Sequence, residues 1–417
     1  MNEFDPIIGY EEEKKEFERL CDIMKHPDKY RALGVNTPKG LLLIGEPGLG
    51  KTTMAKCIVK ASGRPAFTCR KDKPDGAFVN EIRETFQKAK EQAPSIIFLD
   101  DIDKFANEDN RHRNAEEFVT IQSCIDDCRD SEVFVLATAN EDDCLPPSLL
   151  RAGRFDKTVE ICAPKVEDAA EIIRHYLGQK NFVSDIDADQ IAHILDGRSC
   201  AELETVVNEA GIYAGYENKE SIGMDDMVRA CLRVIFGEPE SFRYDEEFLK
   251  TVAWHEAGHA VVNELLEPGS VNLVSVATYN GDVGGITSYT QNRNYFGSKK
   301  FMENRVLSVL GGKAATEITF GTTDVGASSD LNRAFNIVDR FADDYCTYGF
   351  GEFERSSNTG TRVLDRKDTV VALEMQRYYN ETRRMLCEHR ALLDRVATAL
   401  MEKKTLLRKD LEEIFAA

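Results

Sequence analysis

The sequence has no long apolar run. A helix that crosses a membrane needs about 18 to 20 consecutive apolar residues, whereas the most apolar stretches here are as short as Leu41–Ile44 and Val133–Ala137. The N-terminus also lacks the basic and then apolar order of a secretion signal, since it reads MNEFDPIIGY. We therefore expect a cytoplasmic chain that encodes no membrane contact of its own; membrane association would require a further segment before Met1.

Basic residues are in deficit. Lys and Arg total 53 against 73 Asp and Glu, a net charge of −20, so nucleic-acid binding through a broad basic surface is not expected, although a local anion site remains open. The 11 cysteines include no CxxC pair, which favours free thiols in a reducing compartment over a disulfide framework. Cys124 and Cys128 have helical spacing, but one pair alone is more typical of packing than of a metal site.

The 417 residues are enough for two or three domains. Apolar runs alternate with helical patterns over about the first 160 residues, which predicts a doubly wound parallel sheet. The strand candidates are the apolar run after Lys39 and residues 65–69, 95–99 and 132–137, and helices are expected near 79–91 and 116–127.

The rest of the chain is dominated by helical patterns. They continue from Val166 to about Gly237, which predicts a small helical lid, and the segment GEPESFR that follows is the best linker candidate. Further helices come after it, interrupted by a strand-like region at 271–288. The expected domains are residues 1–165, 166–238 and 244–417.

A glycine-rich loop between an expected strand and an expected helix matches the phosphate-loop pattern G-x-x-x-x-G-K-[ST]. Its residues are Gly45, Glu46, Pro47, Gly48, Leu49, Gly50, Lys51 and Thr52, with Thr53 next in the chain. Glycines let backbone N–H groups wrap phosphates at the positive end of a helix. Lys51 is suited to reach the outer phosphates and Thr52 to hold Mg²⁺. The full pattern favours a nucleotide site over a plain glycine turn.

Polar residues follow two of the expected strands, where doubly wound sheets place their ligands. Asp100 and Asp101 end the run IIFL; one carboxylate would hold the metal's water shell and the other would orient the attacking water, although paired acids after a strand can also be a solvated turn. Asn140 ends another apolar run and suits positioning of water near the terminal phosphate. Arg151 and Arg154 flank a glycine turn and are either surface charges or arginine fingers that reach a neighbouring subunit's nucleotide.

The sequence WHEAGH contains a zinc-site pattern. His255 and His259 stand four residues apart, which on a helix puts both imidazoles on one face, and Glu256 lies beside them as a general base for a metal-bound water. Incidental histidines on a helix are the alternative. A catalytic zinc needs a third protein ligand and an open position, and the spacing does not locate that ligand.

Taken in order, these motifs resemble the FtsH-type ATP-dependent zinc metalloproteases, in which an AAA ATPase is fused to a metallopeptidase. The matching segments are FDPIIGYEEEKKEF, LLLIGEPGLGKT, IIFLDDID, LLRAGRFDK, VVNEAG, HEAGHAVV, LGGKAATEI and GASSDLNRA. The resemblance implies an α/β AAA module with a helical lid, followed by a mostly helical zinc metallopeptidase domain. It also implies Zn²⁺, ATP and Mg²⁺ as cofactors, polypeptides as substrates and assembly as a homo-hexamer.

The resemblance also implies roles for single residues. Asn140 corresponds to the sensor residue, Arg151 and Arg154 to the fingers that act in trans, and Asp330 in GASSD to the third zinc ligand. Glu317 in KAATEI resembles a family acid that helps to hold the zinc ligands in position without binding the metal itself. The residues expected near the nucleoside are Ile8, Gly9, His175, Cys200 and Ala201, with Cys200 standing where the family usually has glycine.

Three departures from the family change the expectation. Asp101 stands where the family usually has Glu, and the shorter side chain is expected to slow ATP hydrolysis. The aromatic pore loop is replaced by TCRKDKPD between Phe67 and Gly76, which predicts weak grip and weak unfolding power. Phe78 is the nearest substitute aromatic, although helix packing is the more typical role for it. The family's N-terminal membrane-spanning region has no counterpart in these residues.

We therefore expect an ATP-dependent zinc metalloendopeptidase, with Glu256 and Asp101 as its catalytic carboxylates. Two alternatives remain open. One is a protein-remodelling ATPase whose protease is weak or specialised. The other is a largely ATP-independent zinc peptidase with a regulatory nucleotide domain.

Overall fold

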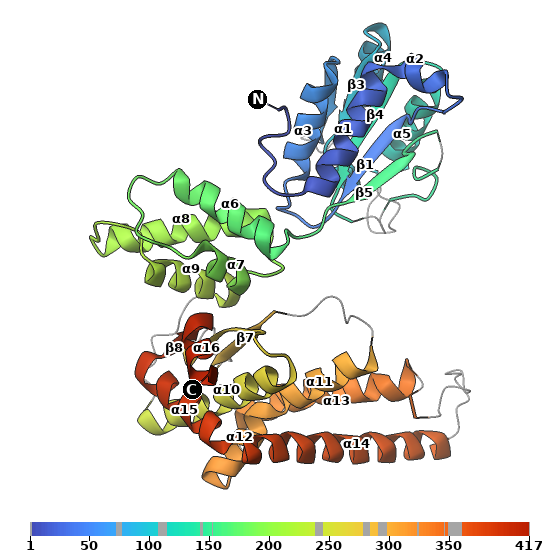
Figure 1. The fold of residues 1–417 in the computed structure, drawn as a ribbon. Helices are drawn as coiled ribbons and strands as arrows, with labels where there is room; N and C mark the ends of the chain where they lie inside the picture. The colour runs from blue at the N-terminus through green and yellow to red at the C-terminus, as the bar shows by residue number, and fades with distance from the viewer. Residues whose placement is uncertain are drawn as a thin grey trace. The chain divides into compact units, whose positions relative to one another are not determined.

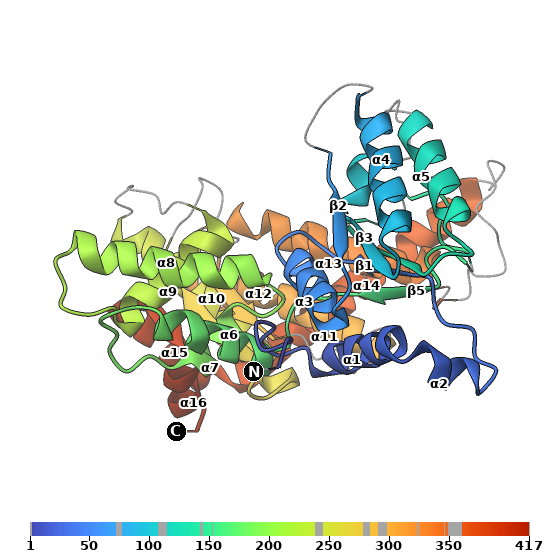
Figure 2. The ribbon, with the colours of Figure 1, turned by 90° about the horizontal axis from the view of Figure 1, so that it is seen from above.

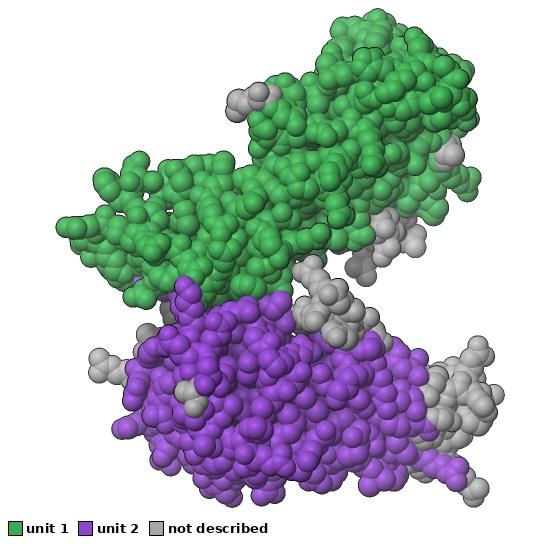
Figure 3. All heavy atoms as spheres, viewed as in Figure 1, with its two compact units in different colours: residues 1–227 green, residues 228–417 purple. Residues whose placement is uncertain are grey.

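The computed structural model describes residues 2–71, 77–106, 115–141, 145–151, 153–237, 245–277, 284–290, 298–322, 325–345, 347–348 and 361–416. The chain divides into two compact units, Met1–Met227 and Val228–Ala417 (Figure 3). Residues 72–76, which include part of the expected pore loop, lie outside the described residues.

The first unit is built on a five-stranded sheet whose strands are all parallel. The strands are β1 (Gly40–Ile44), β2 (Ala66–Cys69), β3 (Ser95–Leu99), β4 (Val133–Ala139) and β5 (Lys157–Glu160), in the order β2-β3-β4-β1-β5. β1 lies between β4 and β5, with Leu41 opposite Leu136. Because β1, β3 and β4 are buried on both faces, they read as continuous apolar runs.

Helices cover both faces of this sheet, as a doubly wound fold requires. One core contains Leu41 and Leu43 with helices α1 (Glu11–Lys25) and α3 (Lys51–Ser62). The other contains Leu42 with α4 (Ala77–Glu91) and α5 (Ala115–Asp127), and Figure 2 shows these two helices side by side. The alternation of side chains along β1 therefore divides the core into two layers.

Four further helices follow the sheet: α6 (Val166–Gly178), α7 (Ala188–Ile194), α8 (Cys200–Tyr216) and α9 (Met224–Phe236), with α9 extending past the end of the first unit (Figure 1). Short α2 (Pro27–Arg31) follows α1, and the 3₁₀ turn η1 (Ile102–Lys104) follows β3. β5 is absent from the expected strands because its four residues alternate between partly buried and exposed and form no apolar run. Phe78 is fully buried and packs edge-on against Phe105, so it belongs to the core.

The second unit is mostly helical. Its helices are α10 (Glu246–Leu266), α11 (Lys299–Val309), α12 (Gly311–Phe320), α13 (Ser328–Asp343), preceded by the 3₁₀ turn η3 (Val325–Ala327), α14 (Thr361–Glu388), α15 (Arg390–Lys403) and α16 (Arg408–Ala416). A small antiparallel sheet has the order β7-β6-β8, from β6 (Val271–Ser275), β7 (Ile286–Tyr289) and β8 (Thr405–Leu407). Both units confirm the expected fold class. Among the described residues, no helix is both long enough and apolar enough to span a bilayer.

Helix α10 is the centre of the second unit, in contact with α11, α12, α14, α15 and two strands. It crosses α12 at two glycines. A Cβ atom on Gly258 would lie 2.4 Å from the carbonyl oxygen of Gly311, and one on Gly311 would lie 2.6 Å from the carbonyl oxygen of Gly258. The two backbones are therefore in direct contact, and any side chain at this crossing would force the helices apart.

We expect Gly258→Ala to destabilise the second unit by about 1 to 3 kcal/mol, because overpacking at a backbone contact cannot be relieved by a side-chain rotation. Calorimetric unfolding measures the change. Gly215→Ala in α8 is the matched control, since a Cβ there meets no atom within 4 Å and helix propensity favours alanine by about 1 kcal/mol. Equal melting temperatures for Gly258→Ala and the parent chain would contradict the tight crossing.

Candidate functional site

The phosphate loop joins the end of β1 to the first turn of α3. Gly50 precedes the helix with φ 85°, a left-handed conformation that glycine adopts without steric cost. The buried Lys51 donates from Nζ to the carbonyl oxygens of Gly45 (2.6 Å) and Glu46 (2.8 Å) and to Oδ1 of Asn140 (3.0 Å). Burial lowers the pKa of Lys51, and the nearby carboxylates oppose that shift.

The polar residues at the ends of β3 and β4 lie beside this loop. Thr52 Oγ1 donates to Oδ1 of the buried Asp100 at 3.0 Å, and Thr138 Oγ1 donates to the same oxygen at 2.9 Å. Asn140 bridges the cluster, since it accepts from Lys51 and donates to Asp103 at 3.1 Å. A phosphate-binding loop, a hydroxyl and a buried carboxylate are the donor set that a nucleotide with Mg²⁺ requires, so the residues fit this cofactor.

Asp101 lies one residue further and is held differently. Its backbone has φ 55°, and Oδ2 accepts from Lys104 Nζ at 2.6 Å and lies 3.9 Å from Arg70. The carboxylate is therefore ion-paired with Lys104, while the backbone N–H of Asp101 donates to Oγ1 of Thr138 at 2.9 Å. No sequence pattern indicated the pairing with Lys104.

The two candidate finger arginines have different surroundings. Arg151 is exposed. Arg154 is only 12% exposed in its side chain and binds Asp126 through two N–H groups, from Nε at 3.0 Å and from Nη2 at 2.7 Å. Arg154 also donates to the carbonyl of Ser148.

The expected nucleoside residues lie on three segments. Ala201, at the start of α8, donates its backbone N–H to the carbonyl of Gly48 at 3.1 Å. Cys200 lies 3.5 Å from the hydroxyl of Tyr10, which follows Ile8 and Gly9 in the chain. The structure thus brings the N-terminal segment, the phosphate loop and α8 together. His175 is exposed on α6 beside Gln179.

The metal-site residues come from two helices of the second unit. The Nε2 atoms of His255 and His259 lie 3.1 Å apart, and each lies 3.1 Å from Oδ2 of Asp330 on α13. Zinc bonds of about 2.1 Å in a tetrahedron separate ligand atoms by about 3.4 Å, so the spacing fits Zn²⁺. Burial raises the pKa of Asp330, but hydrogen bonds to the two histidines outweigh it and the pKa lies well below its usual value.

Backbone groups orient the histidines. His259 Nδ1 lies 2.8 Å from the carbonyl of Ser308 on α11, so Nδ1 carries the proton and Nε2 keeps its lone pair for a metal. Gly312 on α12 supports the other ring, because a Cβ there would lie 2.4 Å from His255 Nε2. Neither Ser308 nor Gly312 was expected from the sequence, since a backbone carbonyl and a missing side chain leave no pattern of residue types.

Glu256 is buried between α10 and β7. Thr287 Oγ1 donates to Glu256 Oε2 at 2.8 Å and lies 3.1 Å from its carbonyl oxygen. Gly285 lies against the same side chain, because a Cβ there would be 2.9 Å from Oε1. Thr287 is a positioning residue that the sequence did not reveal, because it is 31 residues away in the chain.

Glu317 on α12 accepts hydrogen bonds from Lys313 and from the hydroxyl of Tyr379. Among the described residues, the group able to hold a metal ion consists of His255, His259 and Asp330. The supporting role expected for Glu317 therefore stays a prediction.

Comparison with known proteins matches both halves of the chain. Residues 41–163 match the ATPase family associated with various cellular activities (AAA), and residues 243–414 match peptidase family M41. These matches confirm the resemblance drawn from the motifs, and with it the expected cofactors, which are ATP with Mg²⁺ for the first part and Zn²⁺ for the second.

The alignments with individual relatives cover 99% of this chain. It is 32% identical to ATP-dependent zinc metalloprotease FtsH 2 of Phytoplasma mali, 30% to FtsH 1 of Thermomicrobium roseum and 31% to FtsH of Caldicellulosiruptor bescii. The chain spans 62%, 68% and 71% of the lengths of these three relatives. It therefore belongs to the family of FtsH-type ATP-dependent zinc metalloproteases.

Proposed function

We propose that this chain is an ATP-dependent zinc metalloendopeptidase that works as a homo-hexameric ring on polypeptide substrates. The observation that carries the proposal is the meeting of His255, His259 and Asp330 beside the buried Glu256, in a chain that also has a complete phosphate loop. The three ligands leave a fourth position for water or substrate, which is the arrangement of a catalytic rather than a structural zinc.

Peptide hydrolysis depends on Glu256. His255, His259 and Asp330 would hold Zn²⁺, which would act there as a Lewis acid that polarises the peptide carbonyl and acidifies a water molecule. Glu256 accepts the proton of the attacking water at its carboxylate and donates it to the leaving amine. The hydrogen bond from Thr287 to Oε2 fixes the carboxylate, while the bond of His259 to Ser308 holds that ring with Nε2 directed at Asp330.

ATP hydrolysis depends on residues around Lys51. With nucleotide bound, Lys51 would exchange its backbone acceptors for phosphate oxygens, Thr52 and Asp100 would hold the Mg²⁺ shell, and Asp101 would orient the attacking water. The ion pair of Asp101 with Lys104 draws the carboxylate away from that task, which adds to the effect of its shorter side chain. We therefore propose slow ATP turnover.

The ring would bring arginines of one subunit to the nucleotide of the next. Arg151 is exposed and can make such a contact directly. Arg154 must first release Asp126, so its participation would depend on assembly. We propose that both act in trans.

Glu256→Gln should reduce cleavage of casein by at least about a hundredfold, the contribution of a general base, while zinc content and ATPase activity stay near those of the parent. Glu247→Gln, an exposed position on the same helix, is the matched control and should retain full activity. Parent cleavage should also stop on addition of a zinc chelator. Unchanged proteolysis by Glu256→Gln would refute the zinc-protease assignment.

Asp330→Asn should weaken zinc binding by at least about a hundredfold, because loss of a ligand costs more than loss of a residue behind it, and ATPase activity should persist. Metal content after dialysis, measured by atomic absorption, decides this. Asp344→Asn, an exposed acid beyond the end of the same helix, is the control. Full zinc occupancy with normal peptidase activity would assign the third ligand to another acid, with Glu317 the first to test.

Asp101→Asn should bind ATP normally and hydrolyse it about a hundredfold more slowly, since the water-orienting carboxylate is lost. Lys104→Gln keeps the carboxylate and removes its ion pair, so we expect hydrolysis at the parent rate or faster. Phosphate release at saturating ATP measures both. If Asp101→Asn turns over at the parent rate, the catalytic role belongs to Asp100 instead.

A further inference from the structure

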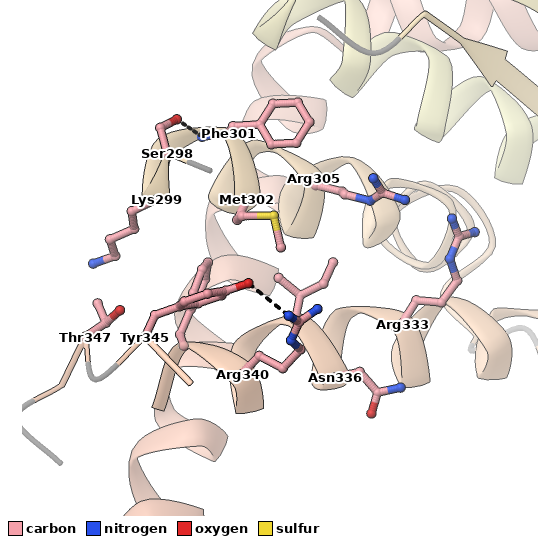
Figure 4. Close-up of a pocket in the computed structure, with 12 residues that line it drawn as sticks. Ser298, Lys299, Phe301, Met302, Arg305, Arg333, Asn336, Arg340, Tyr345 and Thr347 are labelled. Atoms are coloured by element: carbon pink, nitrogen blue, oxygen red, sulfur yellow. Dashed lines mark hydrogen bonds between the residues drawn. The ribbon is translucent and has the colours of Figure 1, made fainter. Parts of the chain in front are cut away.

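A groove of about 710 Å³ runs between α11 and α13 in the second unit. Its floor is apolar, formed by Phe301, Met302, Ile337 and Phe341. Figure 4 shows Met302, Arg340 and Tyr345 in the space between the two helices, with Arg305 and Arg333 toward one end and Lys299 and Thr347 at the other. The groove is therefore an elongated space with an apolar base and polar ends.

The charged side chains that line this groove are all cationic: Lys299, Arg305, Arg333 and Arg340. This concentration stands out in a chain whose net charge is −20. Arg305 forms no ion pair among the described residues. The other three have an acid within their own helix or directly after it, namely Glu303 at 3.6 Å, Asp330 at 4.0 Å and Asp344 at 2.9 Å.

Those acids leave donors available to a ligand. The side chains of Lys299, Arg333 and Arg340 are 49%, 58% and 56% exposed. Arg333 is too far from Asp330 for a hydrogen bond, and Asp330 directs Oδ2 at the two histidines. Arg340 also donates from Nη2 to the hydroxyl of Tyr345 at 3.0 Å. An arginine carries five N–H donors, so these partners do not saturate it.

One end of the groove adjoins the metal site. Arg333 lies one helical turn after Asp330 on α13. On α11, Arg305 lies one turn before Ser308, whose carbonyl holds His259. A polypeptide whose scissile bond lies at the three metal ligands must continue away from them on both sides, and Arg333, which lines the groove, has its Nη1 4.0 Å from Oδ1 of one of them, Asp330.

The distance along α13 from the metal ligand Asp330 to Arg340 suits a short stretch of chain. Asp330 and Arg340 are ten positions apart on α13, which at about 1.5 Å per residue is about 15 Å. An extended peptide rises about 3.3 Å per residue, so about four or five residues would cover it. Apolar side chains of such a segment would meet the floor and acidic ones the arginines.

We propose that the α11–α13 groove is a substrate subsite that binds an acidic polypeptide segment next to the scissile bond, with Arg305 and Arg340 as its specificity-determining contacts. The proposal rests on the zinc-protease function proposed above. A substrate segment is favoured over a second copy of this chain because the charged side chains of the lining are all cationic and one of them, Arg333, lies 4.0 Å from the metal ligand Asp330.

The test uses the full chain and two sets of three matched fluorescent peptides. Within a set the peptides differ only in carrying Glu, Gln or Lys about four positions from the cleaved bond. The two sets place that residue on opposite sides of the bond. Binding is measured by anisotropy with Glu256→Gln, which holds the peptide without cutting it. Cleavage of the same peptides is measured with the parent. The variants are Arg305→Gln, Arg340→Gln and the charge reversal Arg305→Glu, and Arg384→Gln, an exposed arginine of α14, is the matched control.

We expect the Glu peptide to bind more tightly than the Gln peptide when the substituted residue lies on one particular side of the cleaved bond. Arg305→Gln and Arg340→Gln should each weaken binding of that Glu peptide about fivefold. In the parent background the same variants should raise KM and leave kcat unchanged. Arg305→Glu should weaken binding of the Glu peptide more than Arg305→Gln does, because three cations remain but a carboxylate now faces the ligand, and about 0.5 M NaCl should reduce the preference for the Glu peptide. Arg384→Gln should change nothing.

Equal binding of the three peptides, or an effect of Arg384→Gln as large as that of Arg305→Gln, would overturn the proposal. So would a change in sedimentation of the Arg305 variants with unaltered peptide preference, because the groove would then be an interface between copies. Failure of the proposed function gives a different result: the Glu peptide binds selectively, yet the parent with Zn²⁺ never cleaves it.

Discussion

The backbone contact between Gly258 and Gly311 is the constraint on which the second unit depends. It lets α10 and α12 approach until carbonyl oxygens meet backbone atoms, and α10 carries both histidines and Glu256. One residue further on α12, Gly312 lies against the His255 ring. A separation of the two helices by the width of a methyl group would move either α10 with both histidines or α12 with the glycine that lies against the His255 ring, so the close packing of this crossing also supports the geometry of the metal site.

The first unit uses a different constraint, the convergence of strand ends. β1, β3 and β4 are neighbours in a parallel sheet, so the phosphate loop, Asp100 and Asn140 leave the sheet at one edge. Hydrogen bonds then link them through Lys51 and Thr52. The buried runs that form the core of the sheet therefore also determine which polar side chains meet, and the chemistry of the site follows from the order of the strands.

Local patterns explain what could be predicted from the sequence. The bounds 95–99 matched β3 because a fully buried strand is a sharp apolar run, and the helical spacing of His255 and His259 placed two metal ligands on one face. Asp330 could be named only through resemblance, since it lies 71 residues from His259. β5 and β8 have four and three residues, which is too short for an alternation of apolar and polar residues to be recognised in the sequence. The contacts of Thr287 with Glu256 and of Arg154 with Asp126 depend on tertiary packing, so the spacing of residues in the sequence does not predict them.

The hydrogen bond from the Ala201 N–H to the carbonyl of Gly48 ties the start of α8 to the middle of the phosphate loop. A Cβ atom on Gly48 would lie 3.0 Å from the side chains of Ala201 and Ser199, so the loop and the start of α8 are closely packed. Ser199 in turn anchors the helix through a reciprocal cap with Glu202. A shift of this loop would therefore move the start of α8 with it, and any tilt of this 17-residue helix would displace its far end, near Tyr216, by more than its start.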